Sequence, residues 1–292
     1  MGGQRRVNPA KADARKKFQG YKPEFAKKAL TARTRARDDR IFRAYKDASE
    51  ILRVFGDTDP EKRKKLFGVL LRGCTVSQRQ IQEFLIHSAS IKDAQYLGFF
   101  LDHLVESSNE DSLHLRFDFL PVKTSPTGHI IQIDGLGRGM KHGTLEAVGD
   151  IGEVGILMQG GTLVVHGNVE YAGEGMEAGK IIIHGNCEQL GGGAEYGALK
   201  GGEIVVEGDA GQITLIEGGK IHVKGNVGIL GWDMYGGIII VDGSVGTICP
   251  EDGEEDWDGI DGGEVHIKGD IGSMGEIEHG KIFHKGKLIV DK

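Results

Sequence analysis

The stretch GTLVVHGNVEYAGEGMEAGKIIIHGN, residues 161–186, holds two successive copies of a phrase that recurs through the second half of the chain. Each copy has a glycine, five residues of mostly alternating strand type, a second glycine, usually Asn or Asp, and an apolar residue. From His142 onward there are about eight copies, which begin at Gly143, Gly161, Gly179, Gly202, Gly219, Gly237, Gly263 and, in decayed form, Gly280. Their starts lie 18, 18, 23, 17, 18, 26 and 17 residues apart. A period near 18 is too short for a helix pair and predicts a β-solenoid, in which each strand pairs with the same strand of the next repeat.

Three positions of the repeat are apolar in nearly every copy and predict the interior. The second residue after the first glycine is Leu145, Leu163, Ile181, Ile204, Ile221, Ile239, Val265 and Ile282. The fourth is Ala147, Val165, Ile183, Val206, Val223, Val241, Ile267 and His284. The residue after the Asn or Asp forms a third column, Ile151, Val169, Cys187, Ala210, Val227, Val245 and Ile271. Because side chains alternate along a strand, we expect these columns to stack inside, with Cys187 as a core thiol rather than a nucleophile.

The second glycine and the Asn or Asp after it predict a corner. We expect the glycine to supply a positive φ there and the polar side chain to hydrogen-bond its own backbone. The segments GLGRG (135–139) and GEGMEAG (173–179) superficially resemble dinucleotide-binding loops, but such a loop requires a following helix, and here more strand repeats follow. We interpret both segments as corners and expect no cofactor.

The third position of the repeat should face outward, yet it is apolar in five copies. We call this column the outward stripe, and it consists of Val164, Ile182, Val205, Ile240 and Phe283. His222 and His266 lie between these residues. An apolar stripe along a solenoid needs a cover, which is either the helical part of the chain or a second copy in a homodimer. Trp257, in the insertion CPEDGEEDWDGIDG, is a further candidate anchor for a partner.

The chain divides into a basic arm at 1–46, a helical unit at 47–118 and a β-helix domain at 119–292. Ile41, Tyr45, Ala48 and Leu52 have helical spacing, and we expect a helix that ends at Gly56. Pro60 is suited to the first turn of a second helix. Further helices are expected in TVSQRQIQEFLIHSA, with an apolar face of Val76, Ile81, Phe84 and Leu85, and in YLGFFLDHLV. LHLRFDFLPV alternates as a strand does.

Charge is distributed very unevenly. Residues 1–72 carry 21 Lys and Arg against 9 Asp and Glu, a balance of +12, and residues 73–292 carry 15 against 34, a balance of −19. Such a split favours a basic arm that binds a polyanion and is attached to an acidic body. No motif that reads a base sequence is present, which favours structured RNA, above all a ribosomal particle, as the polyanion. The candidate RNA-binding residues are Arg5, Arg6, Arg15, Lys16, Lys17, Lys27, Lys28, Arg33, Arg35, Arg37, Arg40 and Arg43. The alternatives are a solvated tail, or an arm that folds onto its own acidic body.

No run of eighteen apolar residues and no apolar leader is present, and three cysteines form no CxxC pair, so we expect a cytoplasmic protein. No nucleophile–base pair is evident, and we predict that the chain is not an enzyme. His166 and His184 share one repeat position and His222 and His266 another, but neither pair has a Cys or carboxylate at ligand spacing, so no metal site is predicted there. The acidic residues of 251–261 either gather a cation or form a loop, which is simply solvated or docks a basic partner.

The phrases GTLVVHGNVEYAGEGMEAGKIIIHGN and GGAEYGALKGGEIVVEGDAG give residues 128–286 a family resemblance. The segment resembles the GXGXG β-helix domain at the C-terminus of the glutamate synthase large subunit, and equally the corresponding β-helix subunit of formylmethanofuran dehydrogenase. The resemblance implies a right-handed parallel β-helix that serves as a structural and assembly element, and it supplies no catalytic residue. Together with the helical N-terminal region, this predicts an α+β chain. It also implies the alternative function, a structural subunit that binds the catalytic subunits of such an enzyme complex.

Overall fold

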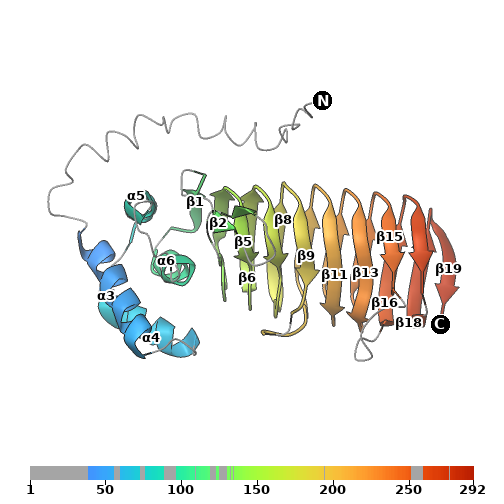
Figure 1. Ribbon diagram of the computed structural model, residues 1–292, viewed down its shortest axis with the longest axis horizontal. Coiled ribbons are helices and arrows are strands. Elements are labelled where there is room, and N and C mark those ends of the chain that lie inside the picture. The colour runs from blue at the N-terminus through green and yellow to red at the C-terminus, as the bar shows by residue number, and fades with distance from the viewer. Residues whose placement is uncertain are drawn as a thin grey trace.

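The computed structural model describes residues 39–55, 60–72, 76–88, 97–108, 110–118, 123–124, 130–131, 133, 135–193, 195–250, 259–275 and 277–292. Within these ranges four helices precede the strands: α3 (Asp39–Phe55), α4 (Pro60–Leu70), α5 (Gln78–Ser88) and α6 (Leu97–Glu106). Figure 1 shows them together at one end of a long stack of strands. α3 therefore runs across residue 46, the expected limit of the basic arm. None of the helices in the described ranges combines the length and the apolar character needed to span a bilayer.

The helical unit has the core that its sequence predicts. Ile41, Tyr45, Ala48 and Leu52 of α3 are buried, as are Val76, Ile81, Phe84 and Leu85 on the predicted face of α5. The rings of Tyr45, Phe84 and Phe100 pack with centroids 5.3–5.5 Å apart, so three helices share one aromatic cluster. α4 begins at Pro60, where a proline costs no hydrogen bond.

The strands form one 17-stranded sheet that is parallel except at its last strand. Its first ladder comprises β1 (Ser112–Arg116), β4 (Thr144–Val148), β6 (Gln159–His166), β8 (Ala178–Ile183), β10 (Glu203–Val206), β12 (Lys220–Val223), β14 (Ile238–Val241), β16 (Ile260–Ile267) and β18 (Ile277–His284). The second comprises β5 (Ile151–Val154), β7 (Val169–Ala172), β9 (Cys187–Gly191), β11 (Ala210–Ile216), β13 (Val227–Met234), β15 (Val245–Ile248) and β17 (Ile271–Met274). β19 (Lys287–Asp291) pairs antiparallel with β18, and β2 (Lys123–Thr124) with β3 (Ile130–Ile131) forms a separate pair.

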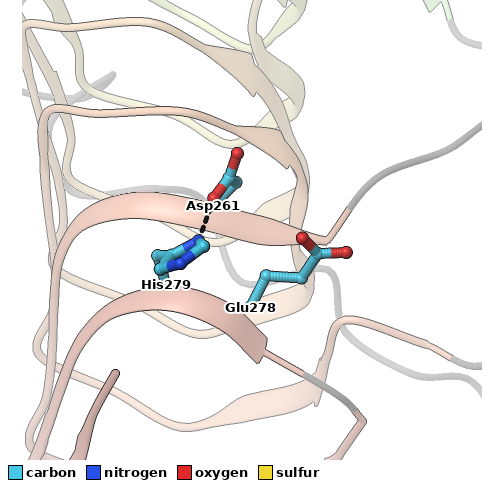
Figure 2. Close-up of side chains that lie close together, drawn as sticks. All are labelled: Asp261, Glu278 and His279. Carbon is cyan, nitrogen blue, oxygen red and sulfur yellow. Dashed lines mark hydrogen bonds and ion pairs between the residues drawn. The ribbon is translucent and has the colours of Figure 1, made fainter.

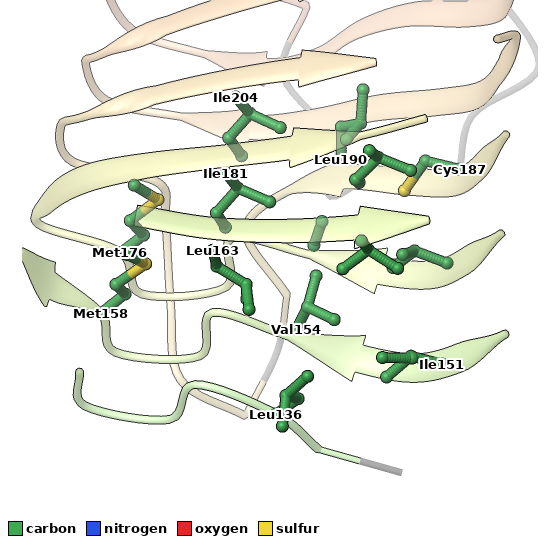
Figure 3. Close-up of a cluster of buried hydrophobic side chains, with 14 of the residues drawn as sticks. Leu136, Ile151, Val154, Met158, Leu163, Met176, Ile181, Cys187, Leu190 and Ile204 are labelled. Carbon is green, nitrogen blue, oxygen red and sulfur yellow. The ribbon is translucent and has the colours of Figure 1, made fainter. Parts of the chain in front are cut away.

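Equivalent positions of successive repeats pair in register, which makes the body solenoid-like. Leu163, Ile181, Ile204 and Ile221, for example, are Cα partners in turn. The three predicted inward columns are buried until the last repeats, where His284 and Ile271 are half-buried. Figure 3 shows Leu163, Ile181 and Ile204 stacked, with Met158 and Met176 beside them. The methionines belong to another inward column that the repeat pattern did not reveal, Met158, Met176, Leu199, Ile216, Met234, Ile260 and Ile277.

The expectation of a positive φ at the second glycine of each repeat is wrong. Positive φ occurs instead at the first glycine of every repeat, for example 78° at Gly161 and 101° at Gly179, and among the second glycines only at Gly149 and Gly286. The second glycine is required by close packing between repeats. A Cβ on Gly167 would lie 1.9 Å from the carbonyl oxygen of Gly149, and one on Gly185 would lie 2.1 Å from that of Gly167.

The expectation that the corner Asn or Asp bonds its own backbone is also wrong. Every side chain in the series of corner residues except the last accepts the backbone N–H of the equivalent residue in the next repeat, at 2.7–3.0 Å. The series runs through Asp150, Asn168, Asn186, Asp209, Asn226, Ser244 and Asp270. A short polar side chain at this corner therefore ties neighbouring repeats together, because the parallel register brings it beside the next backbone amide.

Helix α5 covers the outer edge of β1, whose only partner strand among the described residues is β4. Gln78 Oε1 accepts the N–H of His114 at 2.8 Å. Gln82 Oε1 accepts the N–H of Arg116 at 2.9 Å, and its Nε2 donates to the Arg116 carbonyl at 3.2 Å. The two glutamines are four residues apart and share one helix face. α5 thus satisfies backbone groups that would otherwise form an open sheet edge.

Candidate docking face

The outward side chains of the first ladder form a face that we call the docking face. The outward stripe, Val164, Ile182, Val205, Ile240 and Phe283, runs along its middle on β6, β8, β10, β14 and β18, and each side chain is half-buried. Leu288 of β19 pairs with Phe283 and is 46% exposed, so the apolar column continues onto the last strand. The described helices lie beyond β1 and do not cover this face (Figure 1). A cover by these helices is therefore wrong, and a second copy remains a prediction.

The two histidines that lie between residues of the outward stripe do not interrupt it. The imidazole of His266 stacks on the ring of Phe283 with a centroid distance of 4.4 Å and an interplanar angle of 1°. His222 lies between Val205 and Ile240 in the strand register. A flat imidazole offers an apolar face to its neighbours, so a stacked histidine extends an aromatic and aliphatic column.

Ion pairs between neighbouring repeats flank the stripe. On one side Glu203 Oε2 lies 2.6 Å from Lys180 Nζ, and on the other Glu207 Oε1 lies 2.7 Å from Lys224 Nζ. Asp242 pairs in the same way with Lys268 at 2.8 Å. The hydrogen bonds from these lysines lower the pKa values of the three carboxyl groups, which stay ionised near neutrality. Each of these carboxylates is thus charged, and a lysine of a neighbouring repeat balances its charge.

A chain of histidines and carboxylates occupies the helical end of the docking face. Glu146 lies 2.7 Å from His114 Nδ1 and 2.5 Å from His166 Nε2. His166 stacks on His184 at 4.5 Å and 8°, and His184 Nδ1 lies 2.6 Å from Glu207. Burial alone would raise the pKa of Glu146, but the hydrogen bond and charge of His166, together with His114, lower it overall.

His166 and His184 therefore have carboxylate partners in space, although neither has one at ligand spacing in the sequence. Glu146 is 20 residues before His166, and Glu207 is 23 residues after His184. Such separations resemble no metal-binding motif, and only the stacking of repeats makes the residues neighbours. Among the described residues, the one group of three side chains whose ligand atoms converge is Asp261, Glu278 and His279.

A cavity of about 260 Å³ lies on the second ladder, lined by Glu153, Tyr171, Glu174, Gln189 and the glycines 191–193. Glu174 Oε1 accepts the backbone N–H groups of Glu195 and Tyr196 at 2.9 and 2.8 Å. This carboxylate therefore holds the chain between β9 and β10 in place. We interpret the cavity as a structural feature of the turn between β9 and β10 rather than as a binding site.

The predicted RNA-binding residues fall largely outside the described residues. Arg40 and Arg43 are exposed on α3, and Arg40 donates to the carbonyl of Arg72 at 3.1 Å. Those outside the described ranges are Arg5, Arg6, Arg15, Lys16, Lys17, Lys27, Lys28, Arg33, Arg35, Arg37 and the interface candidate Trp257.

The cysteines within the described residues are buried. Cys187 donates to the carbonyl of Gln189 at 3.2 Å, and Cys249 to that of Gly231 at 3.3 Å. Burial raises the pKa of both thiols, so each stays protonated. The prediction that Cys187 is a core thiol is confirmed by its 2% exposure.

Comparison with protein-family profiles and with curated proteins finds no match for this chain.

Proposed function

We propose that the protein is a non-catalytic, cytoplasmic scaffold whose basic N-terminal region binds structured RNA, with a ribosomal particle as the preferred target. The observation that carries the proposal is the charge balance of +12 in residues 1–72 and −19 in residues 73–292. An acidic body repels phosphates, so RNA contacts must run through the basic region. An irregular basic segment suits phosphate and shape recognition rather than the reading of a base sequence.

In this proposal the body is a right-handed β-helix of about eight turns, and its docking face is the surface for self-association. The support is the half-buried outward stripe, which is flanked by charges already paired within the chain. A partner that covers the stripe gains apolar burial without having to neutralise those flanks. A homodimer meets this requirement because each copy presents the same stripe.

The RNA proposal predicts that removal of residues 1–38 abolishes co-sedimentation with ribosomal particles in a sucrose gradient at low salt. The cut precedes Asp39 because Ile41 and Tyr45 of α3 are buried in the helical unit. For six or more phosphate contacts, affinity of the full-length chain should fall about a thousandfold or more between about 50 and 200 mM salt. An unchanged melting temperature of the truncated protein shows that its loss of binding is not unfolding.

A matched control is Lys200→Gln, which removes one exposed charge from the body. This variant should sediment with RNA as the wild type does. Failure of the full-length chain to sediment at low salt, or binding that survives the truncation, contradicts the RNA proposal.

The alternative function is a structural subunit of a glutamate synthase-like or formylmethanofuran dehydrogenase-like complex, and the GXGXG-like repeats favour it. Affinity capture from native lysate separates the two. Ribosomal RNA and proteins are expected under the first proposal, and amidotransferase or flavin and iron–sulfur subunits under the alternative.

A further inference from the structure

Three potential ligands converge where the last two parallel strands of the first ladder meet. Asp261 lies on β16, and Glu278 and His279 are successive residues of β18 (Figure 2). One ligand atom from each lies within 4.8 Å of the other two. All three side chains are exposed, so a solvated cation can reach them.

A β-bulge accounts for the convergence. Ile260 pairs with Ile277, but the next pair is Asp261 with His279, so Glu278 is an extra residue on β18. In a regular strand, successive side chains point to opposite faces. The bulge lets Glu278 and His279 both flank Asp261, which is how bulges re-aim side chains at binding sites.

His279 also departs from the pattern of its repeat position. The preceding six repeats have glycine or alanine there: Gly160, Ala178, Gly201, Gly218, Gly236 and Gly262. At the five glycines a Cβ would lie 2.2–2.5 Å from a carbonyl oxygen of the preceding repeat. In this repeat the bulged strand accommodates an imidazole, and Nδ1 of that imidazole contacts Asp261 Oδ1.

We propose that Asp261, Glu278 and His279 form a binding site for one divalent cation of the Zn²⁺ class. One imidazole nitrogen with two carboxylate groups suits Zn²⁺, Co²⁺ or Ni²⁺ better than Mg²⁺ or Ca²⁺, which prefer all-oxygen sites. Three protein ligands leave further positions for water. Because the ligands come from two strands, the bound ion links β16 to β18.

The test is isothermal titration of the untagged, chelator-treated, full-length protein with Zn²⁺. We expect one saturable site per chain. Loss of a residue that merely supports a metal ligand already weakens metal affinity about tenfold or more, so loss of the ligand itself in His279→Asn should weaken Zn²⁺ affinity at least about tenfold. The same loss is expected for Asp261→Asn. The matched control is His142→Asn, because His142 is an exposed histidine that also directly precedes the first glycine of a repeat. It should leave Zn²⁺ binding unchanged.

A thermal melt provides the second measurement. A cation that binds only the folded chain raises its melting temperature, so Zn²⁺ should raise that of the wild type and of His142→Asn but not that of His279→Asn. Absence of saturable binding, or equal binding by wild type and His279→Asn, overturns the proposal. Neither result bears on RNA binding, which depends on a different part of the chain.

Discussion

Asp102 is the buried carboxyl group that joins the helical unit to the solenoid-like body. From α6 it accepts the N–H of Gly137 at 2.7 Å. Desolvation by burial outweighs this hydrogen bond and the nearby charge of Arg138, and it raises the pKa of Asp102 to about 7. The GLGRG corner (135–139) is thus a structural junction, in keeping with its interpretation as a corner, and it has three glycines at positive φ.

At the residue scale, we predict that Asp102 makes the fold less stable as pH rises. The folded protein binds this proton more tightly than the unfolded chain, whose pKa is near 3.8, so stability falls between about pH 4 and pH 7 and then levels off. Asp102→Asn keeps the acceptor for Gly137 and removes the ionisation. Its advantage over wild type should grow by up to about 4 kcal/mol from pH 4 to pH 8. Denaturant unfolding at both pH values measures this, and an equal difference at the two contradicts it.

At the element scale, the edge of the parallel sheet needs a partner as much as its interior does. β1 receives that partner from the side-chain amides of α5 rather than from another strand. The same helix packs Ile81 and Leu85 into the helical core, so one element serves two purposes. Gln78 and Gln82 lie four residues apart and therefore share one face of the helix. That face is turned to β1, and the apolar residues occupy a different face.

We predict that Gln78→Ala with Gln82→Ala loosens the helical unit from the sheet. The double variant leaves backbone groups of His114 and Arg116 without their protein partners, at a cost of about 1–3 kcal/mol. Hydrogen exchange of the two amides should accelerate. The control is Arg79→Ala, which removes a surface ion pair with Glu83 and should change stability by less than about 0.5 kcal/mol. Unchanged exchange at His114 and Arg116 in the double variant would refute the capping role.

At the scale of the whole molecule, the helices and the strands provide different surfaces. The helical unit closes one end of the body, and the docking face stays uncovered by the described elements along the ladder (Figure 1). Lysine–carboxylate pairs on both flanks prevent a net charge from accumulating beside the outward stripe. This arrangement favours an apolar partner surface over a polyanion at the docking face.

We predict that Val205→Lys with Ile240→Lys weakens self-association. Two added ammonium groups in the centre of the stripe would have to be desolvated in a dimer, which should raise the dissociation constant at least tenfold. Sedimentation equilibrium across a concentration series measures it. Val69→Lys is the control, because Val69 is 70% exposed on α4, away from the docking face. A wild-type chain that stays monomeric at every concentration would contradict the homodimer.

The sequence by itself determined three of the columns that lie inside the body, because inward and outward positions alternate along a strand and repeat with the same period. That is why the columns through Leu163, Ile183 and Cys187 could be predicted and why the outward stripe could be recognised as an exception. The sequence did not reveal the inward column through Met158 and Met176.

Only the tertiary structure decided which polar groups meet. Glu146 and His166, or Asp261 and His279, lie 18 to 20 residues apart in the chain and become neighbours through strand register and a bulge. The reason for the second glycine was hidden in the same way, since the carbonyl that excludes a Cβ belongs to the preceding repeat. Periodicity specifies the direction of a side chain, whereas its contacts depend on the exact stacking of one repeat on the next.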